Sequence, residues 1–75
     1  MQNDKFSKIL KSLRKEKGVT QANLSDILQI SQKTIAHLEN NYRNPSCDLL
    51  IKIADFFNVS LDYLVGRTDN PQINQ

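Results

Sequence analysis

Apolar residues recur at helical spacing in five short segments separated by turns. The first segment covers residues 4–17, and its apolar residues fall at i, i+3, i+4 and i+7, which places them on one helix face. These residues are Phe6, Ile9, Leu10 and Leu13. Gly18 follows the pattern and suits a left-handed C-terminal cap, so we expect the helix to end at Lys17.

The next two segments each begin with a hydroxyl residue followed by glutamine. Thr20 can cap a helix over about residues 21–28, and Ser31 can cap one over about residues 32–40. We expect their buried faces to consist of Leu24, Ile27 and Leu28 in the first and of Ile35 and Leu38 in the second. Asn41 suits the end of the latter helix, since Asn tolerates positive φ.

The last two segments are also capped by serine. Ser46 precedes a helix that ends at about Phe57, and Ser60 precedes a short one over residues 61–64, stopped by Gly66. The core face of the longer helix consists of Leu50, Ile53, Ala54 and Phe57. Strand signals are weak, so we predict an all-α domain of five helices over residues 1–66 and a flexible C-terminal tail over residues 67–75.

The length and composition exclude several classes of function. A chain of 75 residues is one domain with little room for an enclosed substrate cavity. It contains no apolar run of about 20 residues and no signal-peptide pattern, so we expect a cytoplasmic protein without membrane contact. Cys47 is the only cysteine, and we expect it to be a buried or half-buried apolar residue. We expect no metal, no cofactor and no enzymatic activity.

Charge is distributed unevenly along the chain. Residues 1–43 carry a net charge of +4, whereas residues 44–75 carry −2. This asymmetry indicates one face directed at a polyanion, although an uneven solvated surface would give the same count.

The second and third helices form the most informative pair. Two short helices joined by about three residues cross at a steep angle, as in a helix-turn-helix. Because the third helix needs only a narrow apolar side, its other side is free. It presents Gln32, Lys33, Thr34, Ala36, His37 and Asn40, a set that suits contact with base edges in the major groove of DNA.

Residues 20–31 (TQANLSDILQIS) and 31–41 (SQKTIAHLENN) resemble the two halves of the helix-turn-helix in phage repressor and Cro (Xre-type) proteins. Residues 44–46 and 53–64 are similar to later parts of that family's domain, and the resemblance covers about residues 5–66. It implies a five-helix lambda-repressor-like DNA-binding domain. The sequence departs from the family pattern at Ser25, where Ala is usual, and at Gln29 and Asn41, where Gly is common. A left-handed Gln29 would cost about 1 kcal/mol.

The resemblance also implies roles for individual residues. Base-reading positions are Gln32, Lys33, His37, Thr34 and Ala36, and DNA backbone positions are Gln21, Ser31, Asn40, Tyr42 and Arg43. Gln can pair bidentately with adenine. Gln21 could in addition brace Gln32, and Tyr42 could stack on a partner rather than touch a phosphate. Arg14 and Glu39 match a family pair that forms a partly buried salt bridge.

One such domain reads only a few base pairs, so we expect a homodimer on two half-sites. We place its contact at Phe56, Tyr63 and Val65, with the alternative that these residues only complete the core. The expected function is sequence-specific binding of double-stranded DNA by a transcriptional repressor on a palindromic operator. The alternative is an antitoxin-type module that binds a partner protein and regulates its own gene.

Overall fold

The computed structural model describes residues 4–72, which form five α-helices and no β-strand. The helices are α1 (Asp4–Lys17), α2 (Gln21–Leu28), α3 (Gln32–Glu39), α4 (Cys47–Phe57) and α5 (Leu61–Leu64). The all-α, five-helix prediction is therefore confirmed. None of these helices is long and apolar enough to cross a membrane. Residues 73–75 of the predicted tail lie outside the described range.

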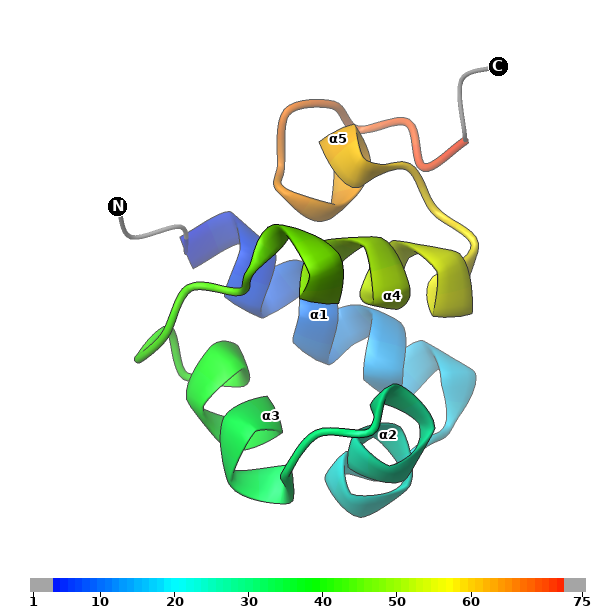
Figure 1. Cartoon of the computed structure of the whole chain (residues 1–75). Helices are drawn as coiled ribbons and strands as arrows, with labels where there is room; N and C mark the ends of the chain where they lie inside the picture. The colour runs from blue at the N-terminus through cyan, green and yellow to red at the C-terminus, as the bar shows by residue number, and fades with distance from the viewer. Residues whose placement is uncertain (1–3, 73–75) are drawn as a thin grey trace.

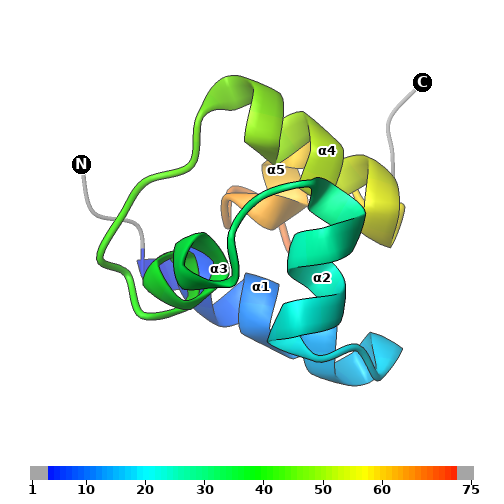
Figure 2. The ribbon, with the colours of Figure 1, turned by 60° about the horizontal axis from the view of Figure 1, so that its bottom comes forward.

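Helix α1 runs through the middle of the molecule and contacts helices on both sides (Figures 1 and 2). On one side α3 packs against α1 and α2, and on the other α5 packs against α1 and α4. The α2–α4 contact closes the remaining side. The α2–α3 pair and the α4–α5 pair therefore lie at opposite ends of the molecule in Figure 1.

The helix starts follow the four hydroxyl residues that the sequence marks. The side-chain oxygens of Thr20, Ser31, Ser46 and Ser60 each accept a hydrogen bond from the backbone N–H three residues later. Each bond satisfies a helix N–H that has no partner within its own helix and contributes about 1 kcal/mol. These local bonds explain why the predicted and observed starts of α2 to α5 agree.

Each helix ends in a Schellman motif. In this motif a residue in the left-handed conformation allows the backbone N–H of the next residue to donate to a carbonyl in the last turn of the helix. The left-handed residues are Gly18, Gln29, Asn41, Asn58 and Gly66. In each case the following N–H donates to the carbonyl five residues earlier, as Ile30 does to Ser25 at 3.0 Å. Gln29, at φ 60°, takes the left-handed conformation that its place in the turn requires. The turns are consequently short and fixed.

The core is apolar and contains residues from all five helices. Its fully buried members are Leu10, Leu24, Ile35, Leu38, Ile53 and Leu64. The prediction that Ile27 is buried is wrong, because 48% of this residue is exposed. Relative to Leu24, Leu28 lies about 40° and Ser25 about 100° around one side of α2, whereas Ile27 lies about 60° around the other. Helix α2 turns the small Ser25 inward and leaves Ile27 outside.

The prediction for Cys47 is also wrong, since this residue is exposed. Cys47 is the first residue of α4 and follows a loop whose residues 42–44 and 46 are all exposed. The first two residues of α4, Cys47 and Asp48, therefore lie outside the core, whereas Leu49 and Leu50 pack against it. At the other end of the domain, the Ser60 N–H donates to the Pro71 carbonyl at 2.9 Å, which holds this part of the tail beside the start of α5.

Candidate nucleic-acid interface

Helices α2 and α3 are joined by a turn of three residues, Gln29, Ile30 and Ser31. The left-handed Gln29 reverses the chain and Ser31 starts the next helix. On α2, Ser25 is buried and its hydroxyl donates to the Ala22 carbonyl at 2.7 Å. Ser at this position thus satisfies its own polar group within α2.

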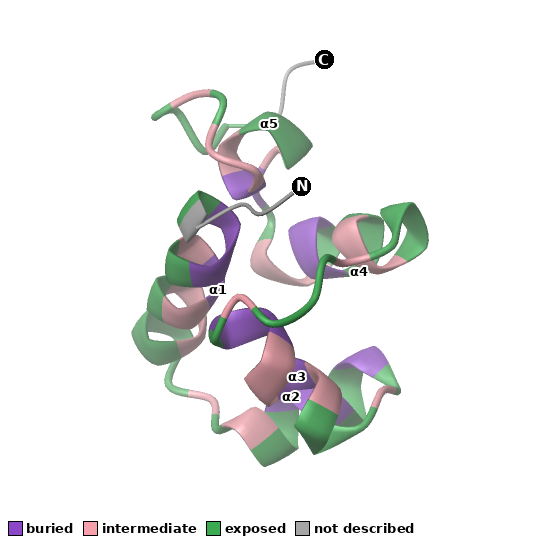
Figure 3. Ribbon diagram, turned by 90° about the vertical axis from the view of Figure 1, so that its left-hand side faces the viewer, coloured by how far each residue is buried: buried purple, intermediate pink, exposed green. Residues whose placement is uncertain are grey.

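The outer side of α3 carries the predicted base-reading residues (Figure 3). Gln32 and Lys33 in the first turn are exposed, and Thr34, Ala36 and His37 are half-buried. Ile35, Leu38 and Glu39 face inward and are buried. The helix therefore presents a polar side at its N-terminal end, and the Ser31 and Thr34 hydroxyls there share a hydrogen bond of 2.8 Å.

The predicted backbone-contacting residues flank this side of α3. Ser31 precedes the helix, and Asn40, Tyr42 and Arg43 follow it, and all four are exposed. Lys33 and Arg43 thus place one cation at each end of α3. Three of the four acidic residues in the second half of the chain, Asp48, Asp55 and Asp62, lie on α4 and α5, and the fourth, Asp69, follows α5.

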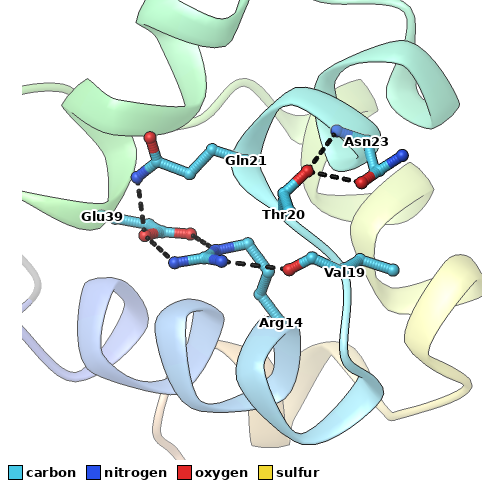
Figure 4. Close-up of polar contacts among 6 residues, drawn as sticks. All are labelled: Arg14, Val19, Thr20, Gln21, Asn23 and Glu39. Atoms are coloured by element: carbon cyan, nitrogen blue, oxygen red, sulfur yellow. Dashed lines mark hydrogen bonds and ion pairs between the residues drawn. The ribbon is translucent and has the colours of Figure 1, made fainter.

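Behind α3, three helices meet at the carboxylate of Glu39, whose side chain is only 1% exposed (Figure 4). Arg14 of α1 approaches it with two nitrogens: Nε lies 2.6 Å from Oε2 and Nη2 lies 3.1 Å from Oε1. Arg14 also donates through Nη1 to the Val19 carbonyl, just before the cap of α2. The structure thus brings together the Arg14–Glu39 pair expected from the sequence.

Gln21 of α2 completes this cluster. Its amide Nε2 donates to Glu39 Oε1 at 3.1 Å, so Gln21 braces Glu39, whereas the sequence suggested Gln32 as the residue it braces. In Figure 4 the amide oxygen of Gln21 points away from Glu39. The side chain is therefore held in one orientation at the N-terminus of α2, beside α3.

The α4–α5 end of the molecule contains the residues predicted to form a dimer contact. Phe56, Tyr63 and Val65 are all half-buried. The Phe56 ring packs edge-on against Phe57 at a centroid distance of 4.9 Å, and Lys17 Nζ lies 4.9 Å from the Phe56 centroid. Contacts within the same chain therefore already cover part of the Phe56 ring.

Two more exposed apolar residues on these helices were not anticipated. Ile51 and Leu61 are 43% and 44% exposed. They line an open hollow of about 350 Å³ whose other apolar residues include Ala54 and Val59. Ile51 directly follows Leu50 on α4, a helix with several apolar positions. Because Ile51 lies beside the apolar stripe that faces the core, the sequence could have predicted that its side chain points outward.

Among residues 4–72, no group of three or more His, Cys, Asp or Glu side chains is arranged to hold a metal ion.

Known proteins share this arrangement. Residues 10–64 match the model of a family described as helix-turn-helix. The chain is 35% identical over 70 residues to the HTH-type transcriptional regulator ImmR of Bacillus subtilis (strain 168), a match that covers 93% of this chain. A crystal structure of a transcriptional regulator from Listeria innocua superposes with a TM-score of 0.79 at 30% identity, over 84% of this chain and 59% of that one.

The P22 c2 repressor, solved in complex with a synthetic operator, has the same fold. Its TM-score is 0.79 at 22% identity, over 84% of this chain and 96% of the repressor chain. The chain spans 55% of the length of ImmR, so this relative is considerably longer than the domain described.

Proposed function

The chain belongs to the helix-turn-helix family, and from this premise we propose that it binds double-stranded DNA sequence-specifically and represses transcription as a homodimer on a palindromic operator. Family membership confirms the resemblance drawn from the sequence and agrees with the expectation of a non-enzymatic regulator. With this function, the protein would act in the compartment that holds the DNA, which we propose is the cytoplasm.

The observation that supports this proposal most strongly is the exposed first turn of α3. Gln32 and Lys33 project from a helix whose opposite side is fixed by buried Ile35 and Leu38. An α-helix fits the major groove, where Gln pairs with adenine and Lys with guanine acceptors. Because Glu39 ties α3 to α1 and α2, this turn is held in place before DNA binds.

The DNA backbone would be held by the groups around α3. Gln21 stands at the N-terminus of α2, where backbone N–H groups and the helix dipole favour a phosphate. Its amide has a second N–H that can donate to that phosphate while the first remains on Glu39. Arg43 adds a cation beyond the other end of α3. Such contacts fix the register of the protein on the duplex, and the bases supply specificity.

The homodimer is proposed to form through α4 and α5. Exposed Ile51 and Leu61 supply an apolar centre, and the adjacent Lys52 and Asp55 supply both signs of charge. In a two-fold contact the same patch meets itself, so Lys52 of one copy can face Asp55 of the other. The half-buried Phe56, Tyr63 and Val65 remain predicted members of this interface.

Selection of bound sequences from a random double-stranded DNA pool tests the proposal. We expect enrichment of a two-fold symmetric site whose half-sites lie about one helical turn apart. A Gln32→Ala/Lys33→Ala double variant serves as the control, since both residues are exposed and their loss leaves the core intact. Absence of any enriched sequence with the unaltered chain would overturn the proposal and leave the protein-binding alternative.

A further inference from the structure

The end of α3 brings the loop back onto the helix. Asn41 is left-handed at φ 61°, and its N–H donates to the Leu38 carbonyl at 3.3 Å. The next N–H, that of Tyr42, donates to the His37 carbonyl at 2.8 Å. These two bonds form a Schellman motif, so the backbone itself places Tyr42 beside His37.

The two side chains also meet. The rings of His37 and Tyr42 have centroids 6.0 Å apart and planes inclined at 66°, an edge-to-face arrangement. This geometry lies within the range in which aromatic pairs attract each other. A side-chain contact between these two positions often accompanies a Schellman motif, and here two aromatic rings make it.

The exposure of the Tyr42 side chain is unusual for a tyrosine. Tyr42 is 78% exposed, while His37 is half-buried on the outer side of α3. A ring that remains so exposed contributes little to the core. The contact that the structure gives to its ring is the one with His37, a residue on the side of α3 that faces DNA in the proposed complex.

We propose that Tyr42 is a positioning residue that holds the His37 imidazole in one orientation toward the major groove, and so sets base preference at the position that His37 reads. This inference rests on the proposed function. An unrestrained histidine on a helix surface samples several rotamers, and ordering it on binding costs affinity. A ring held in advance by Tyr42 avoids part of that cost. The role differs from the backbone contact expected for Tyr42 from the sequence.

Four variants distinguish positioning of His37 from a contact between Tyr42 and the DNA backbone. They are Tyr42→Ala, Tyr42→Phe, His37→Ala and the double variant His37→Ala/Tyr42→Ala. The measurement is binding to the selected operator and to operators substituted one base pair at a time. We expect Tyr42→Ala to reduce preference at the same position as His37→Ala, by about two- to tenfold. Tyr42→Phe keeps the ring and retains the preference, and Tyr42→Ala adds no further loss once His37 is absent.

A different pattern would overturn the inference. If Tyr42→Phe and Tyr42→Ala weaken binding equally and uniformly across all operators, the tyrosine hydroxyl contacts the backbone and does not position His37. Because Tyr42 is largely exposed, neither variant is expected to unfold the domain, and the thermal midpoint checks this. If the unaltered chain prefers no sequence at all, the proposed function fails instead.

The contact between the His37 and Tyr42 rings can also be measured in the absence of DNA. His37 is the only histidine in the chain, so its two carbon-bound ring protons give unambiguous NMR signals. Tyr42→Ala should shift both signals by removing the neighbouring ring current, and Tyr42→Phe should largely preserve them. Asn44→Ala, an exposed change two residues further on, is the control and should leave them in place. Unchanged signals in Tyr42→Ala would refute the contact itself.

Discussion

Arg14 and Glu39 lie 25 residues apart in the sequence, yet Arg14 Nε and Glu39 Oε2 are 2.6 Å apart in the folded chain. Because Arg14 is on α1 and Glu39 on α3, this pair ties the proposed recognition helix to the central helix. Gln21 brings α2 to the same carboxylate. The orientation of α3 thus depends on one buried carboxylate that accepts three hydrogen bonds, two from Arg14 and one from Gln21.

We expect Glu39→Ala to destabilise the domain by about 3 kcal/mol, because it leaves the mostly buried Arg14 without its counter-ion. Denaturant unfolding measures this as a lower midpoint. Glu16→Ala, an exposed change on α1, is the control and should alter stability by no more than about 0.5 kcal/mol. Equal effects of the two changes would show that the pair contributes nothing.

Gln32→Ala is expected to weaken binding to the preferred DNA site by about 1–3 kcal/mol and to relax base choice at one position. The reason is loss of a bidentate contact with a base edge. Competition binding against single-base operator variants measures it. Gln72→Ala, an exposed glutamine in the tail, should have no effect. Equal weakening on random and preferred DNA would remove Gln32 from the base-reading set.

Arg43→Ala is expected to weaken binding to all sequences and to reduce the slope of log affinity against log salt by about one, since one phosphate contact is lost. Arg67→Ala is the matched control, because Arg67 is also exposed but follows α5 and pairs with Asp62 at 3.8 Å. An unchanged slope for Arg43→Ala would exclude a phosphate contact there.

Leu61→Lys is expected to weaken self-association at least about tenfold by placing a charge at the centre of the proposed dimer contact. Sedimentation equilibrium measures it. Ile27→Lys is a matched control, since Ile27 on α2 is exposed to 48% and Leu61 to 44%. A dimer that withstands Leu61→Lys but dissociates with Ile27→Lys would place the contact elsewhere.

Gln29→Gly is expected to stabilise the domain by up to about 1 kcal/mol, because φ at this residue is 60° and glycine adopts that conformation without a Cβ penalty. Gln29→Val should destabilise it, since a β-branched side chain is most strained there. Thermal unfolding of both variants tests this. A lower midpoint for Gln29→Gly would mean that the Gln29 side chain contributes more than the strain costs.

The sequence alone determined which segments are helical and where each one starts. Thr20 and Ser31 accept backbone bonds within their own first turns, and Gly18 and Asn41 reverse the chain locally. These interactions span at most a few residues, so the pattern of capping and apolar residues in the sequence is enough to predict them. For the same reason the polar outer side of α3 was predicted from its spacing.

Tertiary structure decided which flank of α2 faces the core and which distant groups meet. Ser25 rather than Ile27 turns inward on α2, and periodicity in an eight-residue helix does not distinguish the two. Gln21 meets Glu39 only because two helices cross at one point. The exposure of Leu61 likewise depends on how α5 packs on α4. These features depend on how all five helices pack together and bury their apolar surface, and a local sequence pattern contains no information about that packing.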